Sequence, residues 1–273
     1  MRQPFDTDAY RYPNEHLILA VTIFLVLVVI VVTATATLCG SAIFVVAMVA
    51  LAVWFSSSKH SQLISHAQKV PDQNLPGLDA VVRDGIARLR PGPVQTFVAP
   101  ADVINAYTFG LSSPKVIVIY SGLLRVMDAD EVRFIVGHEI GHVRLGHTWL
   151  NSLVGGMAGI PSPFAAAVVL HLAFRWWNRA CEFSADRAGL LACGNPRKAI
   201  SALVKLTTGG RYTQTDHERA VKPLSAEDEL VENLGELLST HPGVKRRIEE
   251  LQRYSASPEY RRLQELVSQN SIA

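Results

Sequence analysis

The sequence predicts an α+β, mainly helical fold that begins with a pair of membrane-spanning helices. Three observations lead to this expectation. Residues 17–55 contain no charged side chain. Residues 94–120 contain short segments with the apolar pattern of strands, and helical patterns follow from residue 128 onward. We therefore expect a transmembrane hairpin followed by a domain with a small antiparallel sheet and many helices.

The uncharged N-terminal stretch is too long for one membrane helix. At 1.5 Å per residue it would extend roughly 58 Å, about twice the thickness of the hydrocarbon core. The chain must therefore turn back, and the sequence Thr-Leu-Cys-Gly-Ser at 37–41 is the natural break. We predict membrane helices over about 17–36 and 41–56.

Two other interpretations of this stretch are weaker. A cleaved signal peptide has a shorter apolar region, and here the leading segment carries Asp6, Asp8 and Glu15. A buried hairpin of a water-soluble protein would need a large protein around it. The apolar stretch also explains a mean hydropathy of +0.19.

Basic residues predict the orientation of the hairpin. Arg2 and Arg11 precede the first helix, Lys59 and Lys69 follow the second, and the connecting turn has none. The positive-inside rule therefore places the domain on the cytoplasmic side of a plasma or inner membrane, in a multi-pass protein. Three cysteines without the spacing of a metal or redox pair fit a reducing compartment.

Composition limits the possible partners. The net charge of +2 and the pI near 8.5 give no reason to expect nucleic acid. The expected partners are a lipid bilayer and a polypeptide, and the sequence leaves the oligomeric state open. We divide the chain into an N-terminal cytoplasmic segment (1–16), the hairpin (17–56), a polar linker (57–75) and the domain (76–273).

Within the domain, periodicity predicts the elements in order. The strands are expected to be short, and Leu150–Trp177, broken by Gly and Pro, should form two helices rather than membrane spans. The expected helices are Leu78–Leu89, Val244–Tyr254 and Pro258–Ser268, and the expected strands are Val94–Ala99, Val103–Phe109 and Val116–Tyr120.

The chemistry is concentrated in the sequence His138-Glu139-Ile140-Gly141-His142, an HExxH motif. On a helix the two histidines lie on one face, one turn apart, where both reach one zinc ion. Glu139 lies beside them and can take a proton from a water molecule. The motif therefore predicts zinc-assisted hydrolysis of a peptide bond. Chance matches to five residues are common enough that further support is needed.

The sequence around the motif supports a helix. Asp128 is a good N-cap, and Glu131 three residues later completes a capping-box pattern. Gly137 and Gly141 each weaken the helix by roughly 1 kcal/mol relative to alanine. This cost indicates the close approach of another element, which we expect to be a strand or the substrate over the zinc.

A catalytic zinc needs a third protein ligand. The histidine pattern HExxHxxGxxH fails, because Gly146 and His147 are each one residue out of place. Downstream, Glu182 and Asp186 are four apart and share a helix face. This spacing suits Glu182 as the ligand and Asp186 as a carboxylate that orients a ligating histidine. The alternative is an acidic pair facing solvent. His147 lies off the zinc face and is interpreted as structural.

Four separated motifs carry a family resemblance over residues 95–255. HExxHVxLGH is followed by NRxxExxAD and by His241-Pro242 with Arg247, and Asn105-Ala106-Tyr107 precedes the strand VIVIY. Together they resemble the HtpX-like zinc metallopeptidases, which include the CaaX prenyl endopeptidase type. The resemblance implies a zincin-like metalloprotease domain with one Zn²⁺ per chain.

The resemblance also implies roles for further residues. Asn105 and Ala106 would lie on an edge strand that pairs with an extended substrate. His241 and Arg247 would lie near the metal, where they stabilise the oxyanion or regulate access. The residues alone leave another interpretation open, since a His-Pro turn before a basic helix is also an ordinary helix start.

We expect a membrane-bound zinc metalloendopeptidase that removes misfolded or membrane proteins. Two alternatives stay open. One is a specific processing protease of the CaaX prenyl endopeptidase type, whose specificity usually needs a large membrane chamber that two spans cannot build. The other is a catalytically silent membrane scaffold that binds zinc.

Overall fold

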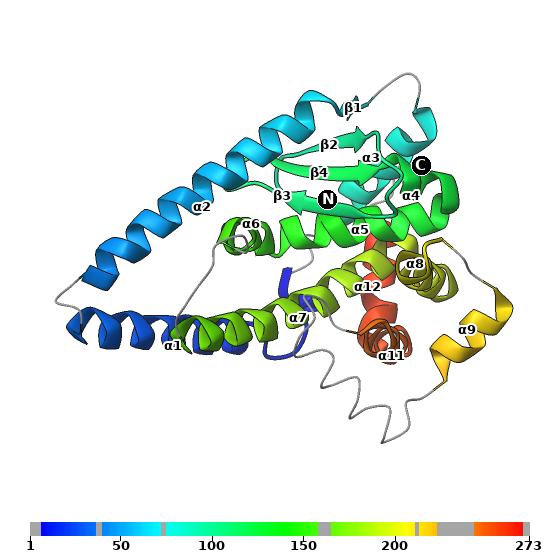
Figure 1. Ribbon diagram of the computed structural model, residues 1–273. Helices are drawn as coiled ribbons and strands as arrows, with labels where there is room; N and C mark the ends of the chain where they lie inside the picture. Colours follow the sequence, from blue (N-terminus) through cyan, green and yellow to red (C-terminus); the bar gives the residue numbers. More distant parts are fainter. Residues whose placement is uncertain are drawn as a thin grey trace.

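The helix that carries the HExxH motif lies at the centre of the domain in the computed structural model (Figure 1). The structure describes residues 7–36, 40–71, 75–157, 165–210, 213–222 and 243–269. The elements up to the central helix are η1 (Thr7–Tyr10), α1 (Glu15–Ala36), α2 (Gly40–Ser65), β1 (Gln68–Val70), α3 (Pro76–Leu89), β2 (Val94–Ala99), β3 (Ala106–Phe109), β4 (Lys115–Tyr120), α4 (Ser121–Val126) and α5 (Ala129–Arg144). The helices that follow are α6 (His147–Met157), α7 (Ala165–Cys193), α8 (Pro196–Thr208), α9 (Gln214–Val221), α11 (Val244–Ser255) and α12 (Pro258–Ser268).

The sheet is mixed, so the expected purely antiparallel sheet is wrong. In the described residues its strand order is β1-β2-β4-β3, with β2 and β4 parallel and the two outer pairs antiparallel. After β2 the chain crosses the end of β4 before it turns into β3. Ala101 is held there by Ser121 and Gly122, and a Cβ on Gly122 would lie 2.6 Å from the Val103 carbonyl oxygen. This crossing makes β3 an edge strand.

Helix α5 begins as its sequence predicts. Asp128 accepts hydrogen bonds from the backbone N–H groups of Asp130 and Glu131, and the Glu131 side chain accepts one from Asp128 N–H. This reciprocal capping box satisfies donors that a helix start otherwise leaves free. The cap therefore sets where the helix begins, nine residues before the first histidine of the motif.

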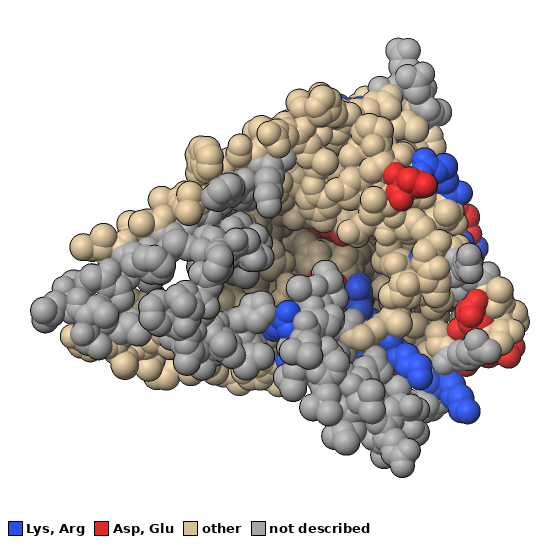
Figure 2. Space-filling view, in the orientation of Figure 1, with Lys and Arg blue, Asp and Glu red and all other residues tan. Residues whose placement is uncertain are grey.

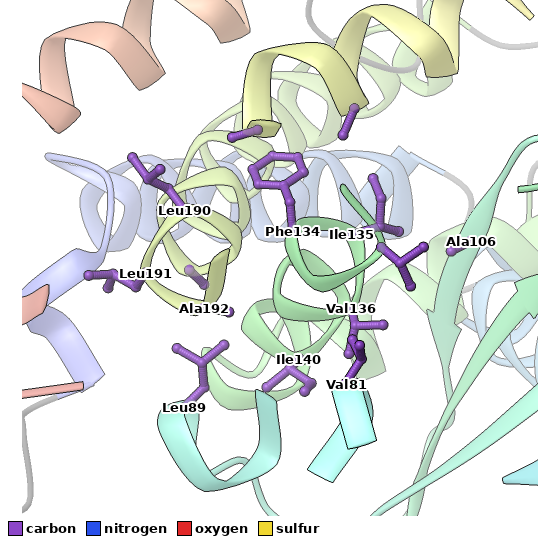
Figure 3. Close-up of a cluster of buried hydrophobic side chains, with 14 of the residues drawn as sticks. Val81, Leu89, Ala106, Phe134, Ile135, Val136, Ile140, Leu190, Leu191 and Ala192 are labelled. Atoms are coloured by element: carbon purple, nitrogen blue, oxygen red, sulfur yellow. The ribbon is translucent and has the colours of Figure 1, made fainter. Parts of the chain in front are cut away.

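The core forms around α5. Phe134 and Ile140 are fully buried, and Figure 3 shows α5 side chains between those of α7 and those of α3, with Ala106 of β3 nearby. Burying a side chain of this size stabilises a fold by about 1.5–3 kcal/mol. Because α5 packs against α7 on one side and α3 on another, the face that carries His138 and His142 is held in a fixed position.

The glycines of α5 allow a helix to approach, and the expected strand or substrate is wrong. A Cβ on Gly137 would lie 2.5 Å from Ala192 Cβ, and one on Gly141 would lie 2.6 Å from Ala188 Cβ. These alanines belong to α7, which therefore packs directly against the backbone of α5. This close approach brings Glu182 and Asp186 to the HExxH motif.

The two N-terminal helices extend away from the sheet, and the first half of α7 lies beside α1 (Figure 1). Among the described residues, α1 is the one helix that is long and apolar enough to cross a membrane, by length and composition. The segment expected to be a linker contains the last turns of α2 and strand β1. Leu150–Trp177 falls in α6 and α7, with 158–164 outside the described residues.

Candidate metal centre

Three potential metal ligands converge where α5 meets α7. His138 Nε2 and His142 Nε2 lie 3.2 Å apart. The Glu182 carboxylate lies 3.7 Å from the first and 3.5 Å from the second. All three side chains are buried. Two imidazoles and one carboxylate are the donor set of one class of catalytic zinc site, so these residues fit a metal ion.

Asp186 orients the first histidine. Its Oδ1 lies 3.0 Å from His138 Nδ1, which makes Nδ1 the protonated nitrogen and leaves the Nε2 lone pair facing Glu182. Burial alone would raise the pKa of Asp186, but the charge of Arg247 and its hydrogen bonds lower the pKa below its usual range. The carboxylate is therefore ionised when it holds His138.

Arg247 of α11 contacts both carboxylates of α7. Its Nη1 is 3.3 Å from Glu182 Oε2, and its Nε and Nη2 donate to Asp186. The sequence placed Arg247 near the metal but gave no sign of this pairing. His241, expected beside it, lies outside the described residues.

His147 lies against the second histidine. Its Nδ1 is 3.1 Å from His142 Nδ1, and its Nε2 is 2.9 Å from Glu15 Oε1. Burial lowers the pKa of His147 to about 4, although the hydrogen bond with Glu15 opposes this, so the ring is neutral at neutral pH. Sequence reasoning missed Glu15, for which the only signal was a carboxylate at the head of an apolar helix.

Glu139 faces the edge strand. Thr108 of β3 donates to Glu139 through Oγ1, with 2.6 Å between Oγ1 and Oε2. Thr108 was not predicted as a site residue, since a threonine in a strand is common.

Asn105 is exposed just before β3. Its carbonyl oxygen accepts a hydrogen bond from Tyr120 N–H, and its side-chain oxygen accepts one from Ala106 N–H. Figure 2 shows a hollow in the middle of this face of the molecule, with charged atoms at its bottom.

The comparison with known families agrees with this geometry. The model of peptidase family M48 matches residues 78–255. This chain belongs to that family. The match runs from the first turn of α3 to the end of α11, and therefore includes both the HExxH helix and the helix that carries Glu182. The predicted resemblance to HtpX-like metallopeptidases is confirmed.

Two relatives resemble the M48 chain over most of its length, and a third resembles it over less than half. A "Protease HtpX homolog" of Persephonella marina is 26% identical over 249 residues, which cover 76% of this chain and 84% of the relative. One of Thermococcus kodakarensis is 26% identical over 69% of this chain and 77% of the relative. The "Plastoglobule-localized metallopeptidase 48, chloroplastic" of Arabidopsis thaliana is 32% identical over 41% of this chain and 35% of its own.

Membership of M48 establishes the class of reaction. The protein is a metallopeptidase, a hydrolase that depends on a metal and acts on polypeptides. The predictions of enzyme class and of a polypeptide substrate are confirmed.

Proposed function

We propose that this M48 peptidase is a membrane-bound zinc endopeptidase in which His138, His142 and Glu182 hold one Zn²⁺ per chain. The convergence of their nitrogen and oxygen atoms, with separations of 3.2–3.7 Å, carries the proposal. Three protein ligands leave a fourth position for water or substrate, as in catalytic rather than structural zinc sites.

The chain's own residues then perform the proton transfers. A zinc ion at this site would activate water and polarise the scissile carbonyl. Glu139 takes the proton from the attacking water and delivers it to the leaving amine. Thr108 holds the Glu139 carboxylate in place before the reaction. Asp186, itself held by Arg247, keeps His138 in the tautomer that binds a metal.

Among the strands that the structure describes, β3 has a neighbour on one side only, which supports a role in binding an extended substrate, as the resemblance implies for Asn105 and Ala106. In an antiparallel ladder, hydrogen-bonded and non-hydrogen-bonded pairs of residues alternate. Tyr120 N–H donates to the Asn105 carbonyl, so the pair two residues along, Tyr107 and Val118, is also hydrogen-bonded. Alternation then turns the backbone groups of Ala106 and Thr108 away from β4. The Ala106 carbonyl and both Thr108 backbone groups face the position of an added strand next to Glu139.

Exposed apolar side chains support the transmembrane hairpin. Phe24 and Val31 of α1 and Ile43 and Trp54 of α2 are each exposed by about 60% or more. Side chains of this kind in two adjacent long helices are stable in lipid rather than in water. We retain the division into 1–16, 17–56, 57–75 and 76–273, although α2 extends the helix to Ser65. The basic flanks support a catalytic domain on the cytoplasmic side of a plasma or inner membrane.

Misfolded membrane or membrane-proximal proteins are the substrates we propose. The relatives named "Protease HtpX homolog" in Persephonella marina and Desulforapulum autotrophicum match 76% and 79% of this chain, respectively. A site on the face of a small domain beside two membrane helices accepts an unfolded segment more readily than a lipidated C-terminus, which needs an enclosed chamber. A silent scaffold is the weakest alternative, because the three proposed ligands converge and the proposed base Glu139 is present beside them.

The test compares the full-length wild type with Glu139→Gln, both purified in detergent. We expect one zinc in each protein, cleavage of unfolded casein by the wild type, and a loss of about 10²–10⁴-fold in kcat for the variant. An active variant would show that another group is the base. Zinc in both proteins with no cleavage by either would contradict the proposed cleavage of misfolded proteins. It would favour a narrowly specific processing protease or a catalytically silent site.

A further inference from the structure

We propose that Glu15, the first residue of helix α1, is a positioning residue of the metal centre: it holds His147, and His147 holds the metal ligand His142. This inference rests on the proposed function, because it assigns a task toward the metal that His142 binds. The helix proposed to anchor the enzyme in the membrane thereby forms part of the catalytic centre.

The hydrogen bonds define the position of each proton. The Glu15 carboxylate only accepts, so the proton on His147 lies on Nε2, 2.9 Å from Glu15 Oε1. His147 Nδ1 then carries a lone pair and accepts from His142 Nδ1, 3.1 Å away. His142 consequently presents the lone pair of Nε2 toward His138 and Glu182. Without Glu15, His147 can place its proton on Nδ1, which would oppose the proton of His142.

The two metal-binding histidines are thus oriented in parallel ways. A carboxylate of α7, Asp186, bonds His138 directly, and Arg247 holds that carboxylate. A carboxylate of α1, Glu15, reaches His142 through one additional imidazole, and Arg11 holds it with an ion pair. Residues that orient metal-binding histidines in this way typically change metal affinity or activity by 10–100-fold when they are replaced.

The surroundings of Glu15 leave its carboxylate fully engaged. It is buried, and it accepts from Arg11, His147 and Ser184, while the Ser184 hydroxyl in turn accepts from Tyr12 N–H. These three partners, Arg11, His147 and Ser184, fix the carboxylate relative to α7 as well as to α6.

A second metal site is the competing explanation, since Cys181 together with Glu15 and His147 forms a group with ligand-type atoms. The chemistry does not favour it. His147 Nε2 bonds directly to Glu15 Oε1, and Arg11 and Ser184 already donate to the same carboxylate. Arg11 adds a positive charge directly on the Glu15 carboxylate.

A purely structural role, in which Glu15 only attaches α1 to the domain, predicts a different experimental result. The test uses the full-length protein in detergent, loaded with Co²⁺, whose visible absorption reports the geometry of its ligands. We compare the wild type with Glu15→Gln, Glu15→Asp and the control Glu131→Gln. Glu131 is equally buried and ion-paired, to Lys205, but lies two turns from His138.

We expect Glu15→Gln to shift the Co²⁺ bands, to weaken Zn²⁺ binding in chelator competition by about tenfold and to lower kcat with KM little changed. Glu15→Asp, which keeps the charge, should recover part of each loss. Glu131→Gln should lower the melting temperature without changing the bands.

Unchanged bands and unchanged Zn²⁺ affinity in Glu15→Gln, with a lower melting temperature alone, would overturn the inference and leave the proposed function intact. A wild type that binds neither Co²⁺ nor Zn²⁺ would overturn the proposed function and this inference together. Should Glu15→Gln fail to fold, Ser184→Ala decides. It removes one donor to Glu15, and it must shift the Co²⁺ bands away from those of the wild type, since unchanged bands would refute the positioning role.

Discussion

Arg247 holds both oxygens of Asp186, with Nε 2.8 Å from Oδ2 and Nη2 2.6 Å from Oδ1. Asp186 Oδ1 is in turn 3.0 Å from Nδ1 of His138. One carboxylate therefore connects α11, α7 and α5, and the C-terminal part of the domain contributes to the orientation of a proposed metal ligand. Because the pair is buried, bulk water cannot readily replace its hydrogen bonds.

Replacement of Arg247 should have effects that depend on shape as well as charge. Arg247→Lys keeps the charge but loses the two-pronged contact, so we expect Zn²⁺ affinity to fall about 10–100-fold. Arg247→Ala removes the cation that two buried carboxylates share and should destabilise the metal-free fold by about 3–5 kcal/mol. Chelator competition and thermal unfolding measure the two effects.

The control for Arg247 is on the same helix. Arg253 pairs with Glu250 at the surface and is mostly exposed. Arg253→Ala should change stability by no more than about 1 kcal/mol and leave Zn²⁺ affinity unchanged. Equal effects of the two alanine variants would mean that the Arg247–Asp186 pair is no more important than a surface pair.

Gly141 should not tolerate even one added methyl group. Its Cβ would lie 2.6 Å from Ala188 Cβ and 3.3 Å from Ala185 Cα, atoms that cannot rotate away. Gly141→Ala must therefore separate α5 from α7, which we expect to cost about 1–3 kcal/mol and to weaken Zn²⁺ binding, since Glu182 moves with α7. Gly77→Ala, where the added Cβ meets nothing within 4 Å, is the control. Gly141→Ala with normal metal affinity would contradict the argument.

Spacing within one helix predicted much of the centre. His138 and His142 share a face because they are four apart, and the same rule brings Glu182 and Asp186 together. The capping box at Asp128 is equally local. The strand Val94–Ala99 and the helix Pro258–Ser268 have their predicted bounds, since turn residues and proline end the periodic patterns there.

What the sequence could not supply was the pairing of distant elements. Glu15 and His147 are 132 residues apart, and neither lies in a pattern that relates it to the other. The apolar sequence of β4 fits a parallel or an antiparallel neighbour equally well, so the direction of β2 was not predictable. Gly141 indicated close packing, but its partner had to come from the structure.

Thr108 should matter to catalysis more than to metal binding. Its hydroxyl is 2.6 Å from Glu139 Oε2. Thr108→Val keeps the shape but removes the donor, and a hydrogen bond to a charged group contributes about 1.5–3 kcal/mol. We expect kcat to fall about 10–100-fold with Zn²⁺ content unchanged. Thr108→Ser keeps the hydroxyl and should retain most of the activity. Equal losses in the two variants would indicate a packing role instead.

Asp128 should stabilise the metal-free domain in a pH-dependent way. Partial burial raises its pKa, but hydrogen bonds from Lys198 and from backbone N–H groups of α5 outweigh this and lower the pKa below its usual value. A carboxylate with a lower pKa in the folded state contributes its stability above the unfolded pKa of about 4. That contribution disappears as the pH falls through the folded value.

Asp128→Ala should therefore be less stable than the wild type by about 1 kcal/mol at pH 7, and this difference should shrink below about pH 4. Asparagine also caps helices but does not titrate, so Asp128→Asn is the matched control. Its stability relative to Asp128→Ala should stay constant with pH. Thermal unfolding of the metal-free proteins in detergent at pH 7 and pH 3 measures both differences. A gap between wild type and Asp128→Ala that is the same at both pH values would show that the Asp128 cap does not depend on its charge.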